Sequence, residues 1–197
     1  MKKYILVFLT LLLLLFLYNK LGIETNREIA SLSLKPEHDI IAIAVVEKTK
    51  RYPIINLSGW GRGVPDKIKM EGEIYFYNIK ENEIKRISSI KFPKDWNKSQ
   101  KGYNLSLHIW EKDGVYFSLE NCFNRKCEKN HYYFLEKNGK IKNIKSLPKI
   151  SKSYSESMRE KTAYKIYQNN ELNISIGKSG EWKPVLVFRD GKLEPIY

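Results

Sequence analysis

Residues 131–144 read HYYFLEKNGKIKNI, and this stretch decides the class of fold. Two runs rich in apolar and aromatic residues, 131–136 and 140–144, stand on either side of Asn138 and Gly139. An Asn-Gly pair between two such runs is the strongest short-range signal for a β-hairpin, because both residues accept the positive φ that a tight turn requires. The stretch therefore predicts two antiparallel strands joined by a short turn.

The same pattern continues along the chain in both directions. Further pairs of strand-like runs, separated by turn residues, are found at 72–79 and 83–90, 105–110 and 115–120, 163–167 and 172–176, and 185–188 and 192–196. Residues 40–46 are almost all apolar, as in a strand that is buried on both faces. Residues 151–161 are interpreted as a loop with helical character. The body of the chain is therefore predicted to be all-β.

The hairpins fall into three similar units. Ile141 follows Ile84 by 57 positions and Leu193 follows Ile141 by 52, each in the second strand of a hairpin. Four-stranded antiparallel units at such a period resemble the blades of a β-propeller. The resemblance covers residues 39–197 and includes no WD, kelch or Asp-box signature. Because propellers usually have four to eight blades, three units predict an incomplete propeller-like meander or a sandwich, with unrelated hairpins as the alternative.

The amino terminus has the pattern of a targeting segment. Lys2 and Lys3 precede an apolar run at 4–18 that contains five consecutive leucines, which is the arrangement of a secretory signal. No pair of small residues follows at cleavage-site spacing. We therefore expect residues 1–22 to be an uncleaved signal-anchor that places residues 4–23 in the membrane as a single transmembrane helix. Secretion after cleavage is the alternative.

Charge near this segment predicts its orientation. Positive residues favour the cytoplasmic side of a membrane, and Lys2 and Lys3 lie on the amino-terminal side of the apolar run. The amino terminus is therefore expected in the cytoplasm. A polar juxtamembrane spacer at 23–38 and the β-rich domain at 39–197 are expected outside it.

The chain carries a formal net charge of +13. Its cations are 28 lysines and only 7 arginines, and they are spread along the sequence. Arginine is the residue that makes bidentate contacts with phosphates and bases. The composition therefore indicates a solvated basic surface, makes nucleic acid an unlikely partner, and leaves an envelope protein or an anionic polysaccharide as candidate partners.

Cys122 and Cys127 are separated by four residues between two predicted strands. In an oxidising compartment such a pair forms a disulfide, and this is the interpretation we favour. Free thiols, a redox pair or half of a metal site are the alternatives. Redox motifs usually have two residues between the cysteines, and a metal site would need two more ligands, of which only His131 is near.

The segment GWGRG at 59–63 is the most unusual loop in the sequence. Its glycines would let the backbone approach a ligand, Trp60 could stack on a sugar, and Arg62 could bind an acidic group. The alternative is a long connection with Trp60 packed against the sheet. The G-x-x-x-x-G-K signature of a phosphate-binding loop is absent.

Signatures of catalysis are missing from the sequence. His38, His108 and His131 are isolated, and no Ser occurs in a G-x-S-x-G setting. The sequence identifies no catalytic residue, and we expect no cofactor and no metal. The sequence favours a membrane-anchored extracytoplasmic binding or scaffold protein that is not an enzyme. The alternative is an envelope hydrolase acting on glycans or other secreted polymers, with carboxylates brought together only by the fold.

Overall fold

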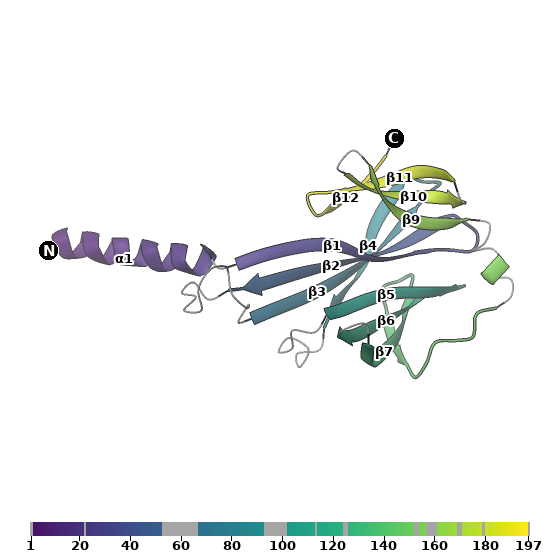
Figure 1. Ribbon diagram of the computed structural model, residues 1–197, viewed down its shortest axis with the longest axis horizontal. Coiled ribbons are helices and arrows are strands. Elements are labelled where there is room, and N and C mark those ends of the chain that lie inside the picture. Colours follow the sequence, from purple (N-terminus) through teal and green to yellow (C-terminus); the bar gives the residue numbers. More distant parts are fainter. Residues whose placement is uncertain are drawn as a thin grey trace.

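The computed structural model describes residues 2–21, 23–52, 67–92, 102–112, 114–123, 126–151, 154–156, 161–168, 171–178 and 180–196. Within these ranges the side chains at 2–3, 14–21, 67, 102–103, 121–123, 126–130 and 168 are not described. In the described part of the chain, α1 (Lys2–Leu21) is followed by twelve strands in three antiparallel sheets (Figure 1).

Each sheet is a four-stranded meander of consecutive strands. Sheet A holds β1 (Ile23–Leu34), β2 (Ile40–Arg51), β3 (Lys67–Asn78) and β4 (Glu83–Lys91). Sheet B holds β5 (Gly102–Glu111), β6 (Gly114–Phe123), β7 (Lys126–Glu136) and β8 (Ile141–Ile144). Sheet C holds β9 (Thr162–Gln168), β10 (Glu171–Lys178), β11 (Glu181–Arg189) and β12 (Lys192–Pro195). The five predicted hairpins and the all-β class are confirmed.

Positive φ angles occur in predicted hairpin turns, although in the Asn138-Gly139 turn only the glycine has one. In the β7–β8 turn Gly139 has φ 90°, and the Lys140 amide donates to Asn138 Oδ1 at 2.9 Å. In the β11–β12 turn Asp190 has φ 49° and Gly191 has φ 76°. These are conformations that Gly, Asn and Asp adopt at low cost. Local turn chemistry therefore fixes both hairpins.

Sheet A is the middle layer of the body, with sheets B and C on its opposite faces (Figure 1). Strand β2 shows this most clearly, because residues 41–46 are each at most 2% exposed. Ala42, Ala44 and Val46 pack in the cluster shared with sheet B, and the intervening Ile41, Ile43 and Val45 pack in the cluster shared with sheet C. Burying an Ile or Val side chain contributes about 1.5–3 kcal/mol, so β2 is the centre of both cores.

The polar spacer expected at 23–38 is replaced by a strand. Residues 23–34 form β1, which pairs with β2 from Ile23↔Arg51 to Leu34↔Ile41. Ile29 and Leu34 are 4% and 0% exposed. Although β1 has a polar sequence, its backbone completes the β2 ladder and its few apolar residues enter the cores. The first unit thus has four strands, like the other two.

The sheets stack as layers, and none of them closes into a ring. Sheet A contacts sheet B with one face and sheet C with the other. The three four-stranded units resembling propeller blades are therefore present, but they do not form a closed propeller. With both faces of sheet A covered, the stack buries its apolar surface without further blades.

Helix α1 projects away from the three sheets (Figure 1). Its large apolar side chains from Tyr4 to Leu13 are 47–82% exposed. Over the residues whose side chains are described, no helix is both long and apolar enough to cross a membrane.

Candidate functional site

A network of charged side chains surrounds Glu73, which lies on the face of sheet A that is turned toward sheet C. The Glu73 carboxylate accepts a hydrogen bond from Tyr75 Oη at 2.7 Å and from Arg86 Nη1 at 2.7 Å, and it forms an ion pair with Arg27. Arg27 Nη2 also donates to Tyr75 Oη at 2.8 Å. Three strands therefore contribute to one polar cluster, which we call the Glu73 network.

Strand register explains why these residues meet. Glu73 is the cross-strand partner of Val45, Tyr75 is the partner of Arg86, and Arg27 is the partner of Glu47. Directly opposed residues share a face of a sheet, as do alternate residues within a strand. Arg27 lies two strands from Glu73, so its long side chain must cross β2 to reach the carboxylate.

The Glu73 network stabilises the ionised form of Glu73 and the protonated form of Tyr75. Burial by itself raises the pKa of Glu73, but hydrogen bonds from Tyr75 and Arg86 and the charge of Arg27 outweigh burial, so the pKa of Glu73 is lowered. Burial and the hydrogen bond to Glu73 raise the pKa of Tyr75. The carboxylate therefore stays ionised and the phenol stays protonated near neutral pH, which does not suit a general acid or base.

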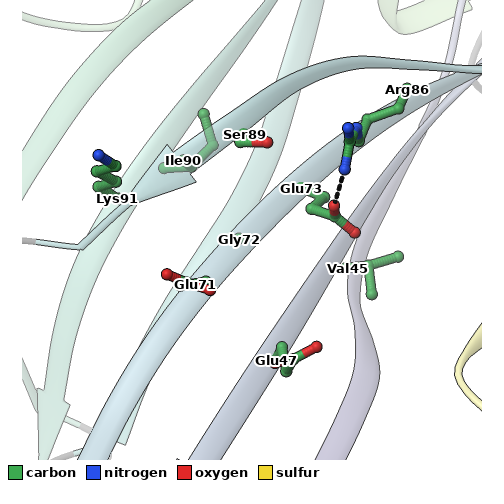
Figure 2. Close-up of a pocket in the computed structure, with 9 residues that line it drawn as sticks. All are labelled: Val45, Glu47, Glu71, Gly72, Glu73, Arg86, Ser89, Ile90 and Lys91. Carbon is green, nitrogen blue, oxygen red and sulfur yellow. Dashed lines mark hydrogen bonds and ion pairs between the residues drawn. The ribbon is translucent and has the colours of Figure 1, made fainter.

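Two hollows flank the network and share Glu47. The first is a cavity of about 260 Å³ lined by Val45, Glu47, Glu71, Gly72, Glu73, Arg86, Ser89, Ile90 and Lys91 (Figure 2). The second, of about 420 Å³, is lined by Thr25, Asn26, Arg27, Glu47, Asp190 and Gly191. We call the two together the Glu47 cleft. Asp190 and Gly191 belong to the β11–β12 turn, so sheet C supplies one wall.

The cleft offers both signs of charge. Glu73 is paired with two guanidinium groups, and Glu71 is 2.8 Å from Lys69 Nζ. Glu47 is different, because its carboxylate makes no hydrogen bond or close ion pair with any described residue. A half-buried carboxylate of this kind can accept hydrogen bonds from a polar or cationic group that enters the cleft.

None of the residues singled out in the sequence is among the described residues that line this cleft. Trp60 and Arg62 lie outside the described residues. Cys122 and Cys127 are Cα partners on β6 and β7, and their side chains are among those not described. The predicted ligand contacts and the predicted disulfide therefore stay predictions.

His108 belongs to a separate hydrogen-bonded chain in sheet B. Its Nε2 lies 2.7 Å from Ser118 Oγ, which donates to Glu120 Oε1 at 2.8 Å. Burial lowers the pKa of His108, and the charge of Glu120 opposes the shift only in part. Ser118 is 0% exposed, so a substrate cannot reach its hydroxyl in this conformation, and the chain serves to satisfy buried polar groups.

Sequence reasoning did not find Arg27, Glu47, Glu73 or Arg86. No motif marks them, because cross-strand pairing brings them together. One signal was present: Glu71 and Glu73 are alternate residues of one strand, and the predicted β3–β4 hairpin brings β4 alongside them. Extending the register across the hairpin would have found Arg86.

No group of three or more His, Cys, Asp and Glu side chains in the described ranges is arranged to hold a metal ion. Comparison with models of known protein families gave no match, and comparison with curated proteins gave no match either.

Proposed function

We propose that this chain is a membrane-anchored extracytoplasmic binding or scaffold protein that presents the Glu47 cleft to a partner. The observation that carries the proposal is the exposure of α1, whose large apolar side chains between Tyr4 and Leu13 are 47–82% exposed. Soluble monomeric proteins rarely leave a contiguous apolar surface of this kind in water. Inside a lipid bilayer these apolar side chains would not be exposed to water. The apolar sequence also continues beyond Leu13 to position 18.

The junction between helix and body supports the same proposal. Helix α1 ends at Leu21 and β1 begins at Ile23, so a single residue separates them. The apolar run at 4–18 spans about 22 Å as a helix. The polar residues at the two ends of α1, Lys2, Lys3, Asn19 and Lys20, would then lie at the two bilayer surfaces. In this proposal the amino terminus is cytoplasmic, sheet A continues directly from the anchor, and the cleft lies near the membrane.

The cleft favours a polar partner. Its walls carry the carboxylates of Glu47, Glu71, Glu73 and Asp190 and the cations of Arg27, Arg86 and Lys91. A surface with both charges favours a protein segment or a polysaccharide that presents polar groups over an apolar small molecule.

A reporter active only outside the cytoplasm, fused after Tyr197, tests location. We expect activity in cells, recovery of the fusion in the membrane fraction, and an intact amino terminus by sequencing. A cytoplasmic reporter signal would overturn the proposal. A soluble secreted product with a new amino terminus would support the cleaved alternative.

A photo-crosslinking residue at Ser89, an exposed position lining the cavity, tests binding at the cleft. The matched control is the same residue at Asn143, an exposed position on β8 of sheet B. We expect an envelope component to be captured from position 89 and not from position 143. Equal capture from both positions, or none from either, would contradict binding at the cleft.

An envelope hydrolase is the second candidate, because Glu47, Glu71 and Glu73 line one cavity. The ion pairs of Glu73 and its lowered pKa weigh against it, since a glycosidase acid needs a raised pKa. Hydrolysis of envelope glycans by the purified chain, abolished by Glu47→Gln, would favour the enzyme over the binding protein.

A further inference from the structure

The end of sheet A nearest α1 is rich in cations. Four aligned positions of three strands make up this end: residues 23–26 of β1, 48–51 of β2 and 67–70 of β3. They include five Lys or Arg residues, Lys48, Lys50, Arg51, Lys67 and Lys69, and one carboxylate, Glu24. We call these twelve residues the basic end. Figure 1 shows these strand ends reaching toward α1 beyond the other two sheets.

The cations of the basic end are on both faces of the sheet. Lys48 and Lys50 share the face of Val46, which is turned toward sheet B, whereas Arg51 and Lys69 lie on the opposite face. What these side chains share is their position at the aligned ends of neighbouring strands. A ligand that meets all of them must therefore be a surface lying across the strand ends, and a molecule seated on one face cannot do so.

Neighbouring residues neutralise only part of this charge. Lys69 is paired with Glu71 at 2.8 Å. Lys48 and Lys50 are half-buried, and neither forms an ion pair with a described residue. Lys48 and Lys50 are thus cations of the basic end, among those whose side chains are described, that can meet an external anion.

The position of the basic end identifies that anion. One residue separates Ile23 from the end of α1, so the basic end lies at the surface of any bilayer that holds the helix. Four positions along a strand span about 10 Å, which is comparable to the headgroup layer of one leaflet and to the Debye length. We propose that the basic end binds anionic lipid headgroups, so that sheet A stands with its strand ends on the membrane.

This inference rests on the proposed anchor, and one experiment separates the two. The full chain is incorporated into nanodiscs of phosphatidylcholine alone, or of equimolar phosphatidylglycerol and phosphatidylcholine, and backbone hydrogen exchange is measured. We expect residues 23–26 and 48–51 to exchange about tenfold more slowly in the anionic discs. High salt should remove the difference, because the charges are screened.

The test variant is Lys48→Gln with Lys50→Gln, and the matched control is Lys145→Gln with Lys149→Gln. The control lysines are exposed and follow β8 in the chain. Replacing them removes the same amount of positive charge at a site away from the basic end. The test variant should lose the lipid-dependent protection while the control keeps it. Unchanged exchange in β6 of both variants would show that the fold is intact.

The possible outcomes distinguish the headgroup contact from the membrane anchor. A chain that enters the discs and shows no lipid-dependent protection overturns the headgroup contact and leaves the anchor standing. Equal loss of protection in both variants also overturns the contact, because it would reflect net charge alone. A chain that stays out of the discs overturns the proposed anchor and this inference together.

Discussion

Trp110 of sheet B donates its indole Nε1–H to the backbone carbonyl of Ser33 in sheet A at 3.1 Å. Two further hydrogen bonds accompany it, from Ser33 Oγ to the His108 carbonyl at 2.8 Å and from the Leu107 amide to Ser31 Oγ at 3.1 Å. Polar groups of β1 and β5 therefore join the two layers beside the apolar core. These three hydrogen bonds between β1 and β5 fix the position of sheet B on sheet A.

The first prediction concerns the hydrogen bond from Trp110 to Ser33. Trp110 is 4% exposed and its ring centroid lies 4.9 Å from that of Phe76. Trp110→Phe keeps an aromatic ring but leaves the Ser33 carbonyl without its donor, which should cost about 1–3 kcal/mol. Trp110→Ala also creates a cavity and should cost about 3–5 kcal/mol. Urea unfolding of the three proteins measures both, and equal stability of Trp110→Phe and wild type would contradict the role of the hydrogen bond.

The second prediction concerns Glu73 and pH. Its pKa in the folded chain lies below the ordinary value of 4.5, so its ionised form stabilises the fold above that value. The stabilisation should be lost as the pH falls from about 4.5 through the lower folded pKa. Because the side chain is 22% exposed, we expect an effect of only about 1 kcal/mol. Unfolding free energies measured across this range should fall less steeply for Glu73→Gln than for wild type.

The control for this measurement is Glu81→Gln, which changes an exposed carboxylate in the β3–β4 turn. Its pH dependence should follow that of wild type. A Glu73→Gln variant whose pH profile matches that of Glu81→Gln would show that the ion pairs contribute no net stability.

Sequence reasoning found the elements whose signals are local. The turns at Asn138 and Gly139 and at Asp190 and Gly191 identify their hairpins, and the apolar run at 40–46 identifies the doubly buried strand. Strand β1 was missed because its sequence is polar and its structure depends on pairing with β2. Pairing over a distance in sequence leaves no local pattern.

The candidate site was hidden for the same reason. Arg27 and Glu73 are 46 positions apart and meet only because β1, β2 and β3 are adjacent in one sheet. The order of the three sheets in the stack could not be predicted either, because the sequence predicts three units but does not show which of their faces pack together. A strand in which apolar and polar residues alternate shows that one of its faces is buried. It does not show which sheet covers that face.

The third prediction uses two glycines with positive φ. Gly191 has φ 76°, and a Cβ there would lie 3.3 Å from Arg27 Cδ in the cleft wall. Gly180 has φ 95°, and a Cβ there would have no atom within 4 Å. Gly180→Ala should therefore report backbone strain alone, about 1 kcal/mol. Gly191→Ala should cost more, because it also displaces Arg27.

Thermal unfolding of both glycine variants measures the difference between them. If Gly180→Ala costs as much as Gly191→Ala, the contact between the β11–β12 turn and Arg27 contributes nothing to stability. The packing of sheet C over the cleft would then need another explanation.

The last prediction concerns Cys122 and Cys127, which are Cα partners on neighbouring strands. Such partners have Cα atoms about 4.5–5.5 Å apart, which is within the range that a disulfide spans. If the body is exported, we expect the pair to be oxidised.

Alkylation without reduction, followed by mass spectrometry, should leave both cysteines unmodified in chain recovered from the envelope. Chain expressed without residues 1–22 should be alkylated at both cysteines in the reducing cytoplasm. Two alkylated cysteines in the envelope fraction would contradict the disulfide and weaken the case for an extracytoplasmic body.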